Sequence, residues 1–237
     1  MDDVVFGHQI NQFGDGNTGS VVNNYRLAAP APPPEPAPRE PVRTVLVLMS
    51  NPVPTPRLQL GEEWRAIYRA IHTARGRDQL ELRYAPALRR ADLQPALLDH
   101  EPVVVHFGGH NSRTAGIVLA DDYGRPRVVP PAALGEVFAI LGASIRCVVL
   151  NACYTKDQAH AIAAHVPCVV GMSTPVLDHV AIEFATGFYH ALANGQSVAD
   201  AFRLGRNELA IHELRAHDPV LVAAPGVAEN TFVTLSR

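Results

Sequence analysis

The sequence predicts an α/β fold in which helices cover both faces of a mainly parallel sheet. Four short runs consist almost entirely of apolar residues and end at small or polar ones, which is typical of strands buried on both faces. These runs alternate with segments of helical periodicity, as the strands and crossover helices of a parallel sheet do. The four runs are residues 44–49, 103–106, 147–150 and 168–172.

The other elements are predicted from local patterns. Residues 62–75 carry apolar side chains at positions i, i+3, i+4 and i+7 counted from Trp64, which indicates an amphipathic helix. Asp92 is expected to cap a helix that ends near residue 100, and Pro131 is suited to the first turn of another helix. We further expect helices at 132–141, 155–165, 178–193 and 197–214, strands at 80–84, 117–120 and 127–129, and a closing strand at 231–235.

Composition narrows the class of protein. The 237 residues suit one domain of ordinary size plus an appendage, and a hydrophobic content of 47% can fill a core. A net charge of −3 argues against a general nucleic-acid surface. Three cysteines without a repeated spacing do not form a disulfide framework, and no stretch resembles a signal peptide or a membrane span. We therefore expect a cytoplasmic protein with reduced thiols and no membrane partner.

The chain divides into three predicted parts. Residues 1–27 form a short Asn/Gly-rich, β-prone interaction segment, whose low charge is typical of chains that stack into cross-β ladders. A disordered tail is the alternative for this segment. Residues 28–42 contain seven prolines and are predicted to be a semi-rigid linker. Residues 43–237 are predicted to form the globular domain.

Two apolar runs end beside chemically capable side chains. His110 follows the run at 103–106, and Cys153 follows the run at 147–150. Open α/β sheets bind ligands outside the carboxyl ends of their strands, so both side chains are expected at one edge of the sheet. A histidine and a cysteine placed together suit nucleophilic catalysis, with the histidine as base and the cysteine as nucleophile.

Neighbouring residues refine this hypothesis. A capping box at residues 155–158 predicts a helix that begins just after Cys153, and a helix N-terminus favours the thiolate form of a nearby cysteine. Two glycines at 108 and 109 predict a turn that leaves His110 accessible, whereas His106 is expected to pack within its strand or to orient another group. The backbone N–H groups of Asn111 and Cys153 are the expected donors to an oxyanion.

Other chemistries find less support in the sequence. Cys147 and Cys168 lie inside apolar runs and are expected to be buried core residues. No tight ligand spacing joins the cysteines to His160 or His165, so we expect no metal site, and no glycine-rich phosphate loop indicates a cofactor. Acidic residues are mostly solvated or capping, but Asp157 and Asp178 are candidates for lining a pocket for a basic substrate residue.

These motifs carry a resemblance to a known family. Residues 106–110 (HFGGH) and 148–154 (VVLNACY) resemble the His and Cys motifs of CHAT domains, which are caspase-like peptidases of bacteria. Residues 169–172, 181–192 and 195–202 are also similar to that family, and the likeness spans about 43–215. The resemblance implies a caspase-like three-layer sandwich fold. It also implies hydrolysis of peptide bonds, with His110 as base and Cys153 as nucleophile. Asn111 stands where the family usually has glycine.

The amino-terminal segment carries a second, shorter resemblance. Residues 12–17 (QFGDGN) resemble amyloid signalling motifs that precede bacterial effector domains, and more distantly the RIP homotypic interaction motif. The combination predicts a cysteine endopeptidase effector of a bacterial signalling or defence system, activated by induced proximity. Its partners would be a protein or peptide substrate and, through residues 1–27, further copies or an upstream sensor. The alternative is a catalytically inactive caspase-like scaffold recruited through the same segment.

Overall fold

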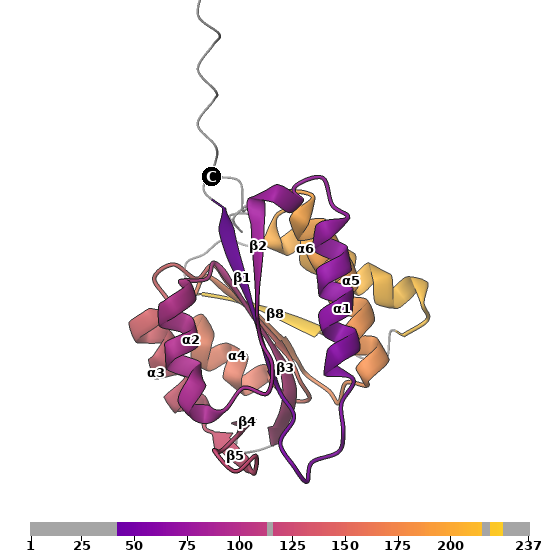
Figure 1. The fold of residues 1–237 in the computed structure, drawn as a ribbon. Helices are drawn as coiled ribbons and strands as arrows, with labels where there is room; N and C mark the ends of the chain where they lie inside the picture. The colour runs from indigo at the N-terminus through magenta and orange to yellow at the C-terminus, as the bar shows by residue number, and fades with distance from the viewer. Residues whose placement is uncertain (1–41, 113–115, 215–218, 225–237) are drawn as a thin grey trace, which may run out of the picture. The chain divides into compact units, whose positions relative to one another are not determined.

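The computed structural model describes residues 42–112, 116–214 and 219–224, and its sheet lies between two layers of helices (Figure 1). The predicted parts 1–27 and most of 28–42 fall outside the described residues, so this division of the chain stays a prediction. The strands are β1 (Arg43–Ser50), β2 (Leu80–Ala85), β3 (Val104–Ser112), β4 (Gly116–Ala120), β5 (Pro126–Val129), β6 (Cys147–Asn151), β7 (Cys168–Met172) and β8 (Pro219–Ala223).

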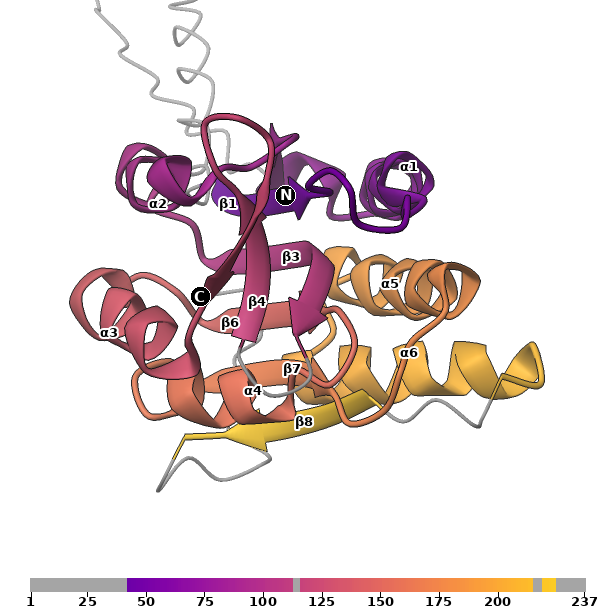
Figure 2. The same cartoon turned by 90° about the horizontal axis from the view of Figure 1, so that it is seen from below.

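Six α-helices and two short 3-10 turns are found in the described residues. The helices are α1 (Leu60–His72), α2 (Leu93–His100), α3 (Pro131–Leu141), α4 (Lys156–Ala163), α5 (Asp178–Ala193) and α6 (Val198–Ile211), with 3-10 turns η1 (Arg77–Gln79) and η2 (Arg90–Asp92). Figure 2 shows α1, α5 and α6 on one face of the sheet and α2, α3 and α4 on the other. This arrangement confirms the α/β fold class, and it is consistent with a caspase-like sandwich.

The strands run in the order β2-β1-β3-β6-β7-β8, with neighbouring strands parallel except for the last pair. Alternate side chains of a strand point to opposite faces, and β1 shows the consequence. Val45 and Val47 belong to the core beneath α1 and α5, whereas Leu46 and Leu48 belong to the core beneath α2 and α3. A run without polar residues is therefore required, because neither face of this strand meets water.

The third strand differs from the prediction. Gly108 and Gly109 do not form a turn, because β3 continues through them to Ser112. Its first part pairs in parallel with β1 and β6, and its last three residues pair in antiparallel with β4. Glycine at 109 instead lets the Ser50 backbone and the Phe107 ring approach the strand closely. A Cβ there would lie 2.7 Å from the carbonyl oxygen of Ser50 and 2.8 Å from the Phe107 ring.

One further prediction about an element end needs revision, and another stays untested. The Asp92 carboxylate makes no cap to α2, although Asp92 directly precedes this helix, because the carboxylate accepts from the backbone and guanidinium N–H groups of Arg89. Among the described residues the last strand of the sheet is β8, which the sequence did not predict, while the predicted strand at 231–235 lies outside them. Within the described part of the chain, no helix has the length and apolar character needed to cross a membrane.

Candidate active site

His110 and Cys153 lie at the same edge of the sheet. Strands β3 and β6 are parallel neighbours, and their register pairs Gly108 with Asn151. His110 and Cys153 each occupy the second position after that pair, so the two strands lead to them at one level of the sheet. Both side chains line a single cavity, which Asn111 and Asp178 also line. Asp157 is exposed in the first turn of α4 and is not among the lining residues.

The backbone around Cys153 is tightly held. Cys153 is half-buried in the turn between β6 and α4, and its sulfur accepts a hydrogen bond from the backbone N–H of Val176 at 3.3 Å. The next residue, Tyr154, has a φ of 54°, a left-handed conformation that is uncommon for residues other than glycine. Such a conformation persists only where surrounding contacts impose it, and it is found most often at functional sites.

Thr155 supplies several of those contacts. Its fully buried hydroxyl lies 3.0 Å from the carbonyl oxygen of Leu150 and 3.1 Å from that of Ala152, and it accepts from the N–H of Met172 at 2.8 Å. The predicted capping box is therefore wrong, because this side chain turns back to the ends of β6 and β7 and makes no cap to α4. The hydroxyl joins the turn that carries Cys153 to the neighbouring strand.

The loop between β1 and α1 orients His110. Its Nε2 lies 2.8 Å from the carbonyl oxygen of Pro56 and 3.2 Å from Oδ1 of Asn51. A carbonyl oxygen can only accept, so Nε2 carries the hydrogen and Nδ1 is the unprotonated nitrogen of the neutral ring. Sequence reasoning did not identify Asn51 or Pro56, since neither residue is close to His110 along the chain.

The Asn111 side chain makes hydrogen bonds in the site that glycine could not make. Its Nδ2 donates to the carbonyl oxygen of Tyr154 at 3.0 Å, and its Oδ1 accepts from Nε2 of Gln158 at 3.1 Å. The side chain thus ties the end of β3 to the turn that carries Cys153. The assignment of the backbone N–H groups of Asn111 and Cys153 as oxyanion donors stays a prediction.

A buried polar cluster lies beneath the cavity. Glu63 is only 3% exposed, and its Oε1 accepts from Nε2 of His106 at 3.0 Å and from Nδ2 of Asn151. His106 is fully buried, with its ring edge against Tyr189, which confirms the expectation that it packs within its strand. The sequence does hold a signal for Glu63, because it shares the buried face of α1 with Ile67 and is the charged member of that face.

A comparison with known protein families accounts for this arrangement. A family model described as "CHAT domain" matches residues 20–220. The chain belongs to the CHAT domain family. This is a family of caspase-like protease type, and the match confirms the resemblance of this sequence to CHAT domains. A comparison with curated proteins finds no match.

The other two cysteines of this CHAT domain belong to the core. Cys147 and Cys168 are fully buried on adjacent strands, as expected, and Cys168 donates to the carbonyl oxygen of Arg146 at 3.2 Å. The Cys168 side chain and burial together hold the pKa of the Cys147 thiol well above its usual range. Neither thiol is suited to nucleophilic attack.

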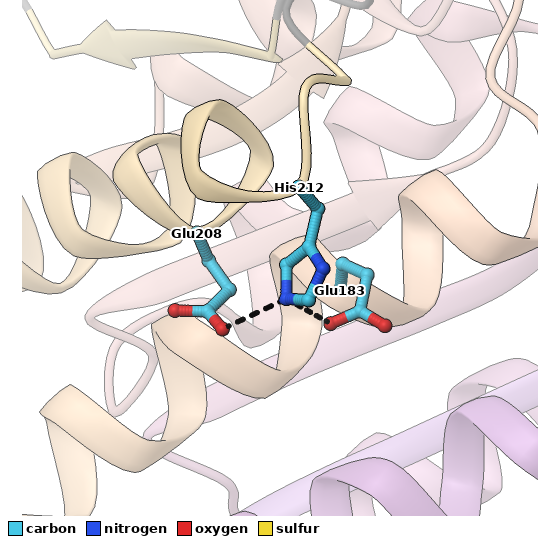
Figure 3. Close-up of side chains that lie close together, drawn as sticks. All are labelled: Glu183, Glu208 and His212. Carbon is cyan, nitrogen blue, oxygen red and sulfur yellow. Dashed lines mark ion pairs between the residues drawn. The ribbon is translucent and has the colours of Figure 1, made fainter.

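One group within the described residues has the side chains that a metal ion needs. Glu183 on α5 and Glu208 on α6 flank His212, which follows α6 (Figure 3). The His212 Nε2 lies 3.4 Å from a Glu208 carboxylate oxygen and 3.7 Å from a Glu183 one. None of the three lines the cavity with Cys153, and partly exposed ion pairs of this kind contribute little to stability.

Proposed function

We propose that this CHAT domain is a cysteine endopeptidase in which Cys153 is the nucleophile and His110 is the general base and acid. The observation that carries this proposal is the shared cavity, which half-buried Cys153 and His110 both line at one edge of the sheet. The bond from His110 Nε2 to the Pro56 carbonyl leaves Nδ1 to exchange a proton with the sulfur. No acidic third residue is needed to orient this ring.

The proposed reaction has two stages. Nδ1 of His110 takes the proton of the Cys153 thiol as the sulfur attacks the substrate carbonyl carbon, and the backbone N–H groups of Cys153 and Asn111 stabilise the oxyanion. The carbon–nitrogen bond then breaks, and the leaving amine takes its proton from His110, which leaves a thioester. Water attacks the thioester carbon while His110 accepts a proton from that water. The carboxylic acid leaves, and the proton returns to the sulfur.

Covalent labelling tests whether the thiol is competent. A peptidyl electrophile that mimics a substrate is expected to add once to the full chain, as measured by intact mass, and not to Cys153→Ala. Buried Cys147 and Cys168 provide the internal control, because neither should react in the folded protein. Labelling with iodoacetamide reports separately whether Cys153 is accessible.

The same experiment separates the peptidase from an inactive scaffold. If iodoacetamide modifies Cys153 and a varied set of peptidyl electrophiles leaves it unmodified, the thiol is exposed but the site is not built for peptides. The alternative function, a caspase-like module that acts only by recruitment, would then be favoured.

We also propose that residues 1–27 recruit the peptidase to further copies or to a sensor in a bacterial signalling or defence system. Their Asn/Gln/Gly composition favours cross-β pairing, and tethering raises the local concentration of peptidase domains to roughly millimolar for short linkers. We expect a peptide of residues 1–27 to form thioflavin-binding fibrils and the double variant Gln12→Asp, Val21→Asp to stay soluble. A wild-type peptide that remains monomeric even with seeds would contradict this role.

A further inference from the structure

We infer that the cavity beside Cys153 binds an arginine or lysine side chain of the substrate, at the residue whose carbonyl is attacked. This inference rests on the proposed peptidase function. The described residues that line the cavity include two carboxylates, Glu63 and Asp178, and neither a lysine nor an arginine. Because the attacked carbonyl belongs to the residue on the amino side of the cleaved bond, the side chain of that residue lies nearest to the sulfur.

Glu63 places a carboxylate in the buried wall of the cavity. Both donors described above, from His106 and Asn151, bind Oε1 and not Oε2. Gly108 leaves room for Oε2, because a Cβ there would lie 2.8 Å from that oxygen. A carboxylate removed from water to this extent is costly unless it is well paired, so a cavity that Glu63 lines suits a cationic ligand.

Asn151 adds a second acceptor that has no partner. Its Nδ2 donates to Glu63 and to the carbonyl oxygen of Ala181, both of which can only accept, so the orientation of this amide is fixed. Its Oδ1 is buried and has no hydrogen-bond partner in the part of the chain that the structure describes. Unpaired buried acceptors are rare in folded proteins, and this one belongs to a residue that lines the cavity. A ligand donor that reached this oxygen would satisfy it, whereas the Nδ2 donors are already used.

Asp178 brings the second carboxylate from a different element. It is the first residue of α5, it is partly exposed, and its Oδ2 accepts from the backbone N–H of Gln59 at 3.0 Å. That bond holds the segment before α1 against the start of α5, so that both flank the cavity. The carboxylate favours an approaching cation and repels an anion.

The three acceptors together select the chemistry of the ligand. A guanidinium offers five N–H donors and an ammonium three, whereas an apolar side chain offers none to Glu63, Asn151 or Asp178. An acidic side chain would face two like charges. A long basic side chain is therefore the class of substrate residue that matches Glu63, Asn151 and Asp178.

The test uses the full chain and four peptidyl electrophiles that differ only in the residue beside the reactive group: Arg, Lys, Asp or Leu. We expect the Arg or Lys probe to label Cys153 about a hundredfold faster than the Asp probe and about tenfold faster than the Leu probe. Rates are measured by intact mass. Asp178→Lys is expected to slow the Arg probe by about tenfold and to speed the Asp probe.

Asp157→Asn is the matched control, because Asp157 is an exposed carboxylate outside the cavity and its removal should leave the order of the four probes unchanged. Glu63→Gln keeps the shape of the buried residue and should reduce the preference for Arg over Leu. If the Asp or Leu probe labels Cys153 as fast as the Arg and Lys probes do, the inference of a pocket for a basic residue is wrong. The proposed peptidase function would still be supported. Labelling by none of the four probes would overturn both.

Discussion

Cys153→Ser is expected to lower the rate of peptide cleavage by roughly a thousandfold or more, because a hydroxyl is a far weaker nucleophile than a thiolate in a site without a stronger base. The fold should survive the change. Cys153 is half-buried at a strand end, and the serine oxygen can still accept from the N–H of Val176. The measurement is cleavage of a peptide that carries the residue preferred by the cavity, beside thermal unfolding of both proteins.

Cys168→Ala is the control for this experiment. It removes a buried thiol from the adjacent strand β7 and should lower stability without a specific loss of cleavage in the folded protein. If Cys153→Ser keeps more than a few per cent of wild-type cleavage, a different residue carries the reaction and the assignment of the nucleophile is wrong.

His110→Ala is expected to reduce cleavage by about a hundredfold to ten-thousandfold, the usual range for a positioned acid and base. The protein should remain folded, because this side chain lies in the cavity and its hydrogen bonds go to a loop. Cleavage is measured at a temperature at which wild type and variant are both folded. Cys153 in this variant should still react with iodoacetamide, since the thiol itself is retained.

His106→Ala is the matched comparison. His106 is fully buried and donates to Glu63, so its removal should cost roughly 3 kcal/mol of stability and act on cleavage through the folded fraction. An equal loss of cleavage from His106→Ala with an intact fold would mean that the two histidines have exchanged roles.

Much of the fold is determined by local sequence patterns. The run at 44–49 is apolar at every position except its first, which is typical of a short strand buried on both faces, and β1 confirms this prediction. Pro131 begins α3 at the first helical position, as predicted, because its fixed φ suits that turn. The edge of the sheet that holds His110 and Cys153 also followed from the sequence, since parallel strands share one carboxyl edge.

Only the tertiary structure determines the contacts between residues that are far apart in the chain. Periodicity cannot show that β3 crosses its glycines to pair with β4, or that Thr155 binds β7 instead of capping α4. The tautomer of His110 is set by Pro56, 54 positions away, and Asn151 meets Glu63 across 88 positions. A local pattern indicates whether a residue is buried. The hydrogen-bond partners of that residue depend on which donors and acceptors the complete fold brings together.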